Sequence, residues 1–418
     1  MDNLLKDKNI VVGVTGSIAI YKALELIRLF IKSSANVKVV MSESAKEFIT
    51  PLTFETVSQN VVLHKDTESW ANDNNHIGIS KWADIFVVAP ATANTINKMG
   101  AGIADNLLLD SVLAYDKTLV IAPSANTKMY LNPNTTSNLK KLKVFGHIIV
   151  EPQNKLLACN DEGVGALAEP LEIFYQTARE LLKNEYWSDR RVVVTGGGTI
   201  EKIDDVRYIS NFSSGKMANA LALALYLKGS DVCLISTKDM SSLPNNIYKI
   251  DVLDTKEMFL YTQKSLEVAK RGLAKDVNIN DKEAPKIIKK KPYLFMAAAV
   301  SDFVPKKAIK GKIKKDSIGD TFTLELKKNV DILSNLSNDE IYKVGFKAEM
   351  DEKSAEENAK KMLSRKNLDA VCLNIINEDN NFGGDFNEIM FIDKNYTQAI
   401  AKDTKLNVSF KILDFLEK

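Results

Sequence analysis

Cysteine and histidine are both scarce in this chain of 418 residues, which contains three of each. No two of the six stand at the spacing of zinc ligands, which argues against a zinc site. A small and odd number of cysteines is also unlike a disulfide framework and favours a reducing compartment. Because these residue types are so rare, each one beside a chemical motif has to be weighed individually.

A large excess of charge of either sign is missing as well. The 56 Lys and Arg residues nearly balance the 54 Asp and Glu residues, for a net charge of +2. A whole-molecule attraction to nucleic acid or to an anionic membrane is therefore not expected. The longest apolar runs, such as residues 9–14, are far shorter than a membrane span, and the first residues lack the apolar core of a signal peptide. We therefore expect a soluble protein of the cytoplasm.

The first half of the chain alternates strands with helices. Four segments have the apolar composition of buried strands: residues 9–14, 37–41, 85–89 and 118–122. Apolar residues at helical spacing follow the first of these strands, over residues 18–32. This alternation predicts a parallel, doubly wound sheet, in which ligands bind at the carboxyl ends of the strands.

A second domain is expected to begin after a polar stretch in the middle of the chain, with a strand followed by a glycine turn. Residues 191–195 form an apolar strand and Gly196–Gly198 a glycine turn. At about 150 residues per domain, the length predicts two or three domains, and this second start puts the boundary near residue 187. The expected domains are residues 1–187 and 188–418. The polar, lysine-rich stretch from Lys264 to Pro292 is interpreted as a surface excursion.

Polar loops follow the predicted strands of the first half. The glycine turn Gly13–Ser17 opens a helix and suits a phosphate, although a plain tight turn explains it equally well. The loops Pro90–Asn94 and Pro123–Asn126 follow two further strands, and the side chain of Asn126 could donate to a carboxylate. These loops are expected to converge on one site.

The few cysteines and histidines differ in their sequence surroundings, and this suggests different roles for them. Cys159 lies in a loop flanked by glycines, where a mobile flap that carries a proton donor is plausible. Cys233 and Cys372 lie inside apolar strands, where inert packing is expected. His76 by itself is most simply a structural histidine.

The second half contains three segments whose composition is typical of phosphate-binding sites. Two are loops rich in glycine and hydroxyl groups, Thr195–Thr199 and Asp205–Lys216, and the second of them opens a helix. The third is the segment Lys306–Lys315, with six lysines in ten residues. Such a run is usually a solvated face. It could also clamp a triphosphate, whereas nucleic-acid binding is less favoured because interleaved aromatic residues are missing.

Taken in order, these motifs resemble a family of bifunctional bacterial enzymes of coenzyme A biosynthesis. That family joins phosphopantothenate–cysteine ligase to phosphopantothenoylcysteine decarboxylase. The resemblance rests on GVTGSIAIYK, FITPLTFETVS, PATANTINKMGAGIADNLL, LACNDEGVGALAEP, VVVTGGGTIEKIDDVRYISNFSSGKM, AAAVSDFVP, KIKK, VGFKAE and RKNLDAVCLN. It implies an α/β fold with two Rossmann-like domains. The first is a flavodoxin-like flavoprotein of the homo-oligomeric cysteine decarboxylase type, and the second is an open α/β ligase domain.

For the first half, the resemblance implies a decarboxylase that uses flavin mononucleotide (FMN). In that family the flavin oxidises the substrate thiol, the thioaldehyde loses carbon dioxide, and the enethiolate is then protonated and reduced. The matching positions are His76 as a base, Asn126 at the departing carboxylate, Met129 in the substrate loop and Cys159 as the proton donor. Those that hold the flavin and its phosphate are Gly16, Ser17, Ser42, Thr92 and Asn94.

For the second half, the resemblance implies a ligase in which a carboxylate attacks the α-phosphate of CTP, and the amine of cysteine then displaces CMP. Asn211 matches the asparagine that stabilises the acyl-cytidylate, and Lys312 the lysine of a mobile loop. The matching substrate-binding positions are Ala298, Ala299, Asp302, Phe346 and Lys366. A divalent cation, Mg²⁺ or Mn²⁺, is implied with the triphosphate. Family members are homo-oligomers built from trimers, act on small molecules and bind neither nucleic acid nor membrane.

The chain departs from the family's usual pattern at several positions. These are Ser124–Ala125 in place of Ala–Met, Tyr130 in place of Trp, Asp205 in place of Pro, Ala218 in place of Gly and Met362 in place of Lys. The change at Met362 implies that one triphosphate contact is weaker or has moved to Lys361. A rival interpretation is a flavin-binding regulatory protein without turnover, against which the retained His76, Asn126 and Cys159 argue.

Overall fold

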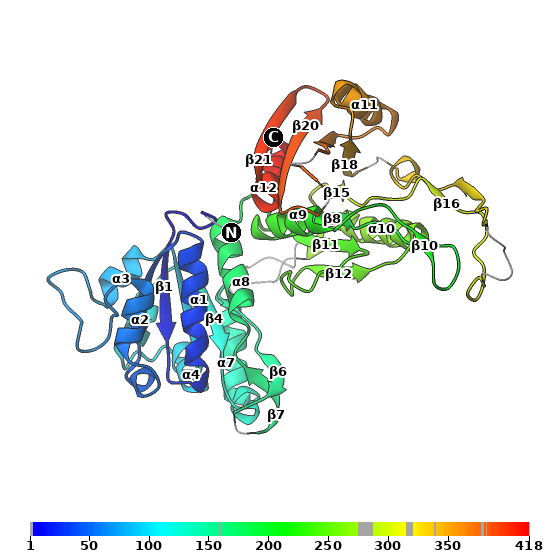
Figure 1. The fold of residues 1–418 in the computed structure, drawn as a ribbon. Coiled ribbons are helices and arrows are strands. Elements are labelled where there is room, and N and C mark those ends of the chain that lie inside the picture. Colours follow the sequence, from blue (N-terminus) through cyan, green and yellow to red (C-terminus); the bar gives the residue numbers. More distant parts are fainter. Residues whose placement is uncertain are drawn as a thin grey trace. The chain divides into compact units, whose positions relative to one another are not determined.

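The computed structural model describes residues 3–158, 160–274, 287–314, 321–337, 340–377, 380–381 and 383–417. The chain divides into two compact units, of which the first ends at Leu182 and the second begins at Lys183. Both are mixed α/β units, as predicted (Figure 1). None of the helices in these ranges has both the length and the apolar composition needed to cross a membrane.

A parallel sheet forms the centre of the first unit. In its described part the strands are β1 (Asn9–Val14), β2 (Asn36–Met41), β3 (Ile85–Ala91), β4 (Leu119–Pro123) and β5 (Ile148–Ile149). They lie in the order β2-β1-β3-β4-β5, all parallel. This is the flavodoxin-like order, in which the chain changes direction across the sheet between β1 and β3.

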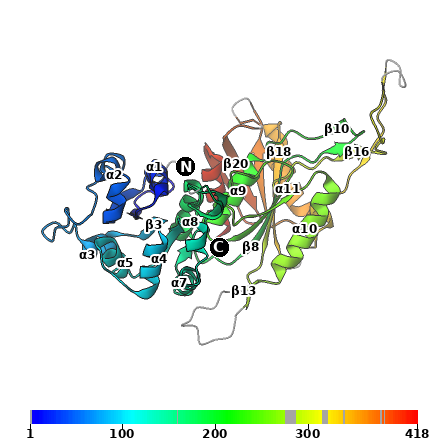
Figure 2. The ribbon, with the colours of Figure 1, turned by 90° about the horizontal axis from the view of Figure 1, so that it is seen from below.

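Helices cover both faces of this sheet (Figures 1 and 2). They are α1 (Tyr21–Lys32), α2 (Pro51–Ser58), α3 (His76–Trp82), α4 (Ala93–Ala101), α5 (Leu107–Leu113), α6 (Thr127–Tyr130), α7 (Pro133–Val144) and α8 (Pro170–Leu182). Helices α1 and α8 pack together through Phe30 and Phe174, while apolar residues of α3, α4, α5 and α7 form a core on the sheet. A hairpin of β6 (Gln153–Leu156) and β7 (Glu162–Ala166) packs against α6.

A larger sheet forms the second unit. Its strands lie in the order β12-β11-β8-β15-β18-β19-β20-β21. Their bounds are β8 (Arg191–Gly196), β11 (Asp231–Ser236), β12 (Tyr248–Asp251), β15 (Tyr293–Met296), β18 (Tyr342–Glu349), β19 (Ala370–Ile375), β20 (Phe386–Asp393) and β21 (Thr397–Thr404). The strands from β12 to β19 are parallel, whereas β20 and β21 extend the sheet in antiparallel fashion. The direction of winding changes between β8 and β15.

Helices flank this sheet in the described residues, among them α9 (Lys216–Leu227), α10 (Thr255–Lys270) and α11 (Glu352–Arg365) (Figure 2). Helix α12 (Lys405–Leu416) is a further one. Helices α9 and α12 pack on each other, and α10 and α11 share the core of the sheet's other face through residues such as Met258 and Leu363.

Short two-stranded ladders lie outside the main sheet. They pair β9 (Glu201–Lys202) with β10 (Tyr208–Ile209), β13 (Leu273–Ala274) with β14 (Ile287–Ile288), and β16 (Phe303–Pro305) with β17 (Leu326–Lys328). The interpretation of Lys264–Pro292 as a surface excursion is partly wrong, and residues 275–286 of this stretch lie outside the described part of the chain. Its start forms the last turns of α10, because Leu266 and Ala269 are buried on the face that packs against the sheet.

Candidate active sites

The winding of the first sheet reverses between β1 and β3, and we call this place its switch point. Hydrogen bonds join the loops that follow these two strands. The Oγ1 of buried Thr15 donates to the carbonyl oxygen of Pro90 at 2.7 Å, and the N–H of Thr92 donates to Thr15 Oγ1 at 3.1 Å. Thr92 also begins α4, because its Oγ1 accepts from the N–H of Thr95. The loops after β1 and β3 are therefore held together at one edge of the sheet, where the sequence placed them.

Hydroxyl groups gather at this edge. Ser17, after β1, has its Oγ 3.0 Å from Ser124 Oγ, after β4, and accepts from the N–H of Ala19. Ser42 follows β2, and its Oγ lies 3.2 Å from Ser44 Oγ. A Cβ at Gly16 would lie 2.7 Å from Ser44 Oγ, so only glycine lets these two loops approach so closely.

A cavity of about 350 Å³ lies beside these hydroxyl groups. Its lining includes Ser17, Ser124 and Asn126, together with the exposed apolar side chains of Ile18 and Leu156. Neutral hydroxyl and backbone N–H donors suit a phosphate monoester, and exposed apolar walls suit a flat ring. Of the predicted flavin positions, Ser17 is in the described lining and Gly16, Ser42, Thr92 and Asn94 are not. The hydroxyl groups of this edge of the sheet taken together fit a flavin mononucleotide.

Asn126 is the N-cap of α6 and faces the flap hairpin. Its Oδ1 accepts from the N–H of Lys128, and its Nδ2 donates to Asp161 Oδ2 at 3.4 Å. A carboxylate therefore already lies at the Asn126 amide. The hairpin is joined to this loop where the N–H of Ala125 donates to the carbonyl of Gly165. A Cβ at Gly165 would lie 2.1 Å from the Ala125 carbonyl oxygen.

His76 stands at the first turn of α3. Its Nδ1 lies 2.9 Å from Glu68 Oε1, and the ring of Trp70 meets it edge-on at 5.4 Å. The cavity beside Asn126 is lined by neither His76 nor Met129 in the described part of the chain, although Met129 follows Asn126 within the single turn of α6. Cys159 lies outside the described residues.

Tyr130, one of the departures from the family pattern, is tied to the flap region. Its hydroxyl donates to Glu151 Oε2 at 3.0 Å. Burial, together with the Glu151 charge, raises the pKa of Tyr130 well above its ordinary value. The phenol therefore remains protonated and acts as a donor. Of the other histidines, His147 accepts at Nδ1 from the N–H of Leu119 and His64 accepts at Nδ1 from the N–H of Asp66. Burial lowers the pKa of His147.

The winding of the second sheet reverses between β8 and β15. At this switch point, backbone hydrogen bonds join the turns that follow the two strands. The N–H of Ala299 donates to the Gly197 carbonyl at 2.8 Å, and the N–H of Thr199 donates to the Ala299 carbonyl. Asn211 completes the arrangement by donating from Nδ2 to the Val300 carbonyl at 3.1 Å. The structure thus brings Asn211 to the turn that contains Ala298 and Ala299.

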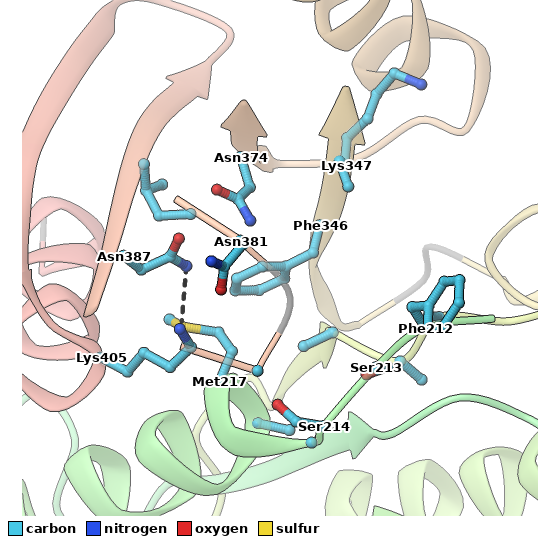
Figure 3. Close-up of a pocket in the computed structure, with 18 residues that line it drawn as sticks. Phe212, Ser213, Ser214, Met217, Phe346, Lys347, Asn374, Asn381, Asn387 and Lys405 are labelled. Atoms are coloured by element: carbon cyan, nitrogen blue, oxygen red, sulfur yellow. Dashed lines mark hydrogen bonds between the residues drawn. The ribbon is translucent and has the colours of Figure 1, made fainter. Parts of the chain in front are cut away.

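A cavity of about 170 Å³ opens beside this turn (Figure 3). The predicted residues that line it are Ala298, Ala299 and Phe346. The sequence did not single out four other polar residues of the lining: Asn374, Asn381, Asn387 and Lys405. They lie on β19, before and on β20 and at the start of α12, far along the chain from the loops of residues 195–199 and 205–216, and no spacing relative to those loops marked them.

The lysine loop is anchored by two aspartates. The N–H of Gly311 donates to Asp205 Oδ2 at 2.7 Å, and the N–H of Ile313 donates to Asp204 Oδ2 at 3.1 Å. Asp205 therefore has a contact that the family's usual proline would lack. Between these two anchored residues, Lys312 is exposed.

Asp204 binds more than the lysine loop. It accepts from the N–H groups of Val206 and Arg207 and pairs with the Arg207 guanidinium at 2.8 Å. Burial opposes ionisation of this carboxyl, but the backbone donors outweigh it and the pKa of Asp204 is lowered.

The remaining predicted residues lie outside the 170 Å³ cavity. The backbone carbonyl of Asp302 accepts from the N–H of Asn329, whereas Lys366 forms an ion pair with Asp331 at 3.0 Å. Met362 packs into the core against β18, since a Cβ at Gly345 would lie 2.8 Å from Met362 Cε.

Both units thus place hydroxyl-rich loops where the winding of a parallel sheet reverses, which defines a two-unit α/β protein with a candidate ligand site in each unit, the first unit being flavodoxin-like. Two family models match the chain: "Flavoprotein" over residues 2–182, and "DNA/pantothenate metabolism flavoprotein C-terminal domain" over residues 187–275 and 280–418.

Relatives match along nearly the whole chain. The Coenzyme A biosynthesis bifunctional protein CoaBC of Haemophilus influenzae is 35% identical over 98% of this chain and 97% of its own length. The protein of the same name from Bacillus subtilis is 36% identical over 98% and 97%. A solved C-terminal domain of a protein with this name covers 56% of the chain and 97% of its own, at 26% identity and a TM-score of 0.42. The chain belongs to this family of bifunctional coenzyme A biosynthesis proteins, as its motifs predicted.

Proposed function

We propose that this chain catalyses two consecutive steps of coenzyme A biosynthesis. The second unit ligates 4'-phosphopantothenate to cysteine through an acyl-cytidylate formed from CTP. The first unit then decarboxylates 4'-phosphopantothenoylcysteine to 4'-phosphopantetheine. The observation that carries this proposal is the match to the bifunctional family over 98% of the chain, which includes both units. The small number of cysteines in the chain is consistent with a location in the cytoplasm.

The first unit would hold FMN at the hydroxyl-lined edge of its sheet. Gly16, Ser17, Ser42, Thr92 and Asn94 would bind the phosphate and the ribityl chain, because hydroxyl and backbone N–H donors meet there. When bound, FMN supplies the two-electron oxidation of the substrate thiol and the later return of those electrons.

The chain's own residues would position the substrate and move protons. Asn126 would donate to the departing carboxylate, and the Asp161 carboxylate at its amide supports this role. Glu68 holds the Nδ1 side of His76, which leaves Nε2 to take the proton of the thiol. Cys159 would return a proton to the enethiolate carbon, and Met129, exposed on α6, would contact the substrate.

The ligase chemistry needs positioning and charge stabilisation rather than a nucleophilic side chain. The phosphopantothenate carboxylate would attack the α-phosphate of CTP and release pyrophosphate, and the cysteine amine would then displace CMP. Asn211 would stabilise the acyl-cytidylate. The turn of Ala298, Ala299 and Asp302, with Phe346, would surround the base, while Lys312 and Lys366 would neutralise phosphates.

The divalent cation would arrive with the nucleotide. Within the described ranges, no group of three or more His, Cys, Asp or Glu side chains could hold a metal ion. We therefore propose that Mg²⁺ or Mn²⁺ enters as part of the CTP complex, held mainly by the phosphates.

The decarboxylase site would be completed in a homo-oligomer built from trimers. His76 does not line the cavity beside Asn126 in the described part of one chain. A neighbouring subunit that presents its His76 to this cavity would join the base to the carboxylate site.

A reconstituted reaction tests the proposal. The purified protein is incubated with 4'-phosphopantothenate, cysteine, CTP and Mg²⁺, and pyrophosphate, carbon dioxide and 4'-phosphopantetheine are measured. All three products are expected, together with a flavin absorbance spectrum. A flavin-containing protein that releases neither pyrophosphate nor carbon dioxide would instead be the regulatory relative without turnover.

A further inference from the structure

One buried lysine of the second unit has no role in the function proposed above. Lys343 is the second residue of β18, and only 2% of its surface is exposed. Its Nζ donates to three backbone carbonyl oxygens, those of Leu333 at 3.3 Å, Leu336 at 3.2 Å and Lys366 at 3.3 Å. The ammonium form of a lysine has three N–H donors, so each of them has an acceptor.

The three carbonyl groups belong to two segments that are separate in the sequence. Leu333 and Leu336 lie in and directly after the short 3-10 helix Leu333–Asn335, whereas Lys366 is the C-cap of α11. The last carbonyl groups of a helix have no partner within the helix, and a polar group that is buried without a partner is costly. One ammonium group therefore satisfies acceptors of both segments and holds the two segments together.

The same two segments meet through an ion pair. The Nζ of Lys366 lies 3.0 Å from Asp331 Oδ2. Asp331 is itself fixed at the start of the 3-10 helix, because its carboxylate accepts from both the N–H and the hydroxyl of Ser334. Lys343 therefore bonds to both of the segments that carry this ion pair.

The segment that carries Asp331 also reaches the turn that would surround the base. The N–H of Asn329 donates to the carbonyl oxygen of Asp302 in that turn at 2.8 Å. Residues 329–336 are thus bonded to the turn at their start and to the ammonium group of Lys343 at their end. A displacement of this segment would move Asp331, and with it the side chain of Lys366, relative to the turn.

We propose that Lys343 is a positioning residue of the ligase. It holds the 329–336 segment against the end of α11, so that the Lys366 ammonium keeps one position relative to the turn of Asp302. The turn and the cation can then engage the base and a phosphate of one nucleotide without further ordering, which lowers the cost of binding. Lys343 itself does not touch the nucleotide. The proposal rests on the ligase function proposed above, in which Lys366 neutralises a phosphate.

Removal of the three donors tests this role. Lys343→Met keeps an unbranched apolar side chain but cannot donate. We expect the Kd of the full chain for CTP with Mg²⁺, measured by calorimetric titration, to rise about fivefold or more. Lys249→Met is the matched control and should bind CTP as the wild type does. Lys249 also donates from Nζ to a backbone carbonyl, that of Leu243, but it lies on β12 at the far edge of the sheet.

A double-mutant cycle separates positioning from a purely structural role. If Lys343 acts through Lys366, Lys366→Met alone weakens CTP binding, and the addition of Lys343→Met weakens it by less than about twofold more. Effects that multiply in the double variant would overturn the proposal, as would an unchanged Kd in either single variant. A lysine with only a structural role would lower the melting temperature and leave the Kd of the folded protein unchanged.

A second variant keeps the test open if Lys343→Met does not fold. Lys343→Gln retains two donors on a shorter side chain that cannot reach all three carbonyl groups, and it should raise the Kd for CTP at least about twofold. Binding equal to the wild type would show that Lys343 is not a positioning residue. A wild type that binds CTP but releases no pyrophosphate would refute the proposed function, yet these titrations would still decide the role of Lys343.

Discussion

The environment of His76 shows how a single residue depends on neighbours outside its motif. Glu68 lies 2.9 Å from its Nδ1, and Trp70 meets the ring edge-on. Both belong to the loop that precedes α3, which has no repeating pattern. The sequence could propose His76 as a base but could not show what orients its ring.

The first prediction concerns this orientation. Glu68→Ala should lower the kcat of decarboxylation by about 10-fold, since a charge-assisted hydrogen bond of roughly 1–2 kcal/mol would be lost. Glu68→Gln should remain close to the wild type because its side-chain oxygen can still accept from Nδ1. Ligase turnover serves as the internal control, and Glu43→Ala removes a comparable surface carboxylate. Equal rates for Glu68→Ala and the wild type would exclude an orienting role.

The second prediction at this scale concerns Cys159. Cys159→Ser should allow carbon dioxide release but stop the reaction before reduction, because a hydroxyl is a much weaker acid than a thiol. Mass spectrometry should then detect a decarboxylated product that lacks two hydrogen atoms relative to 4'-phosphopantetheine. Formation of normal product at the normal rate would show that Cys159 is not the proton donor.

Among the elements, the flap hairpin shows how backbone geometry fixes a candidate site. Gly165 has a φ of +143°, and a Cβ there would lie 2.1 Å from the Ala125 carbonyl oxygen. The hydrogen bond from the Ala125 N–H to the Gly165 carbonyl holds β7 against the loop of Asn126. The sequence predicted glycines in a mobile flap, but not which of them allows this approach.

Gly165→Ala provides the third prediction. The added methyl group should push the hairpin away from Asn126 and lower decarboxylation by about 10-fold or more, because small displacements of positioning groups are costly in catalysis. Gly146→Ala is the matched control: Gly146 also has a positive φ of +89°, but a Cβ there would meet nothing within 4 Å. If both variants lose activity equally, backbone strain rather than the contact with Ala125 is responsible.

At the scale of the whole molecule, the chain consists of two units with separate sheets and cores. The predicted ligase and decarboxylase residues divide between them, since Asn211 lies in the second unit and Asn126 in the first. The product of one reaction is the substrate of the other, but the chemistry of each needs only its own site.

The fourth prediction tests this independence. Asn211→Asp should abolish ligation, because a carboxylate would replace the amide donor beside the Val300 carbonyl. Decarboxylation of supplied 4'-phosphopantothenoylcysteine should continue at the wild-type rate. The two activities are measured separately as pyrophosphate and carbon dioxide, and loss of both would contradict independent sites.

The sequence by itself determined the fold class, the family and the loops that carry the candidate sites. These depend on short-range patterns: apolar strands alternate with helices, and glycine and hydroxyl residues follow strand ends. Only the tertiary structure placed Lys405 and Asn387 in the same cavity as Phe212–Gly215, paired Lys366 with Asp331 and set Glu68 against His76. These contacts join distant segments or an irregular loop, and they depend on strand order and on how helices pack across the sheet, which no local spacing of residues encodes.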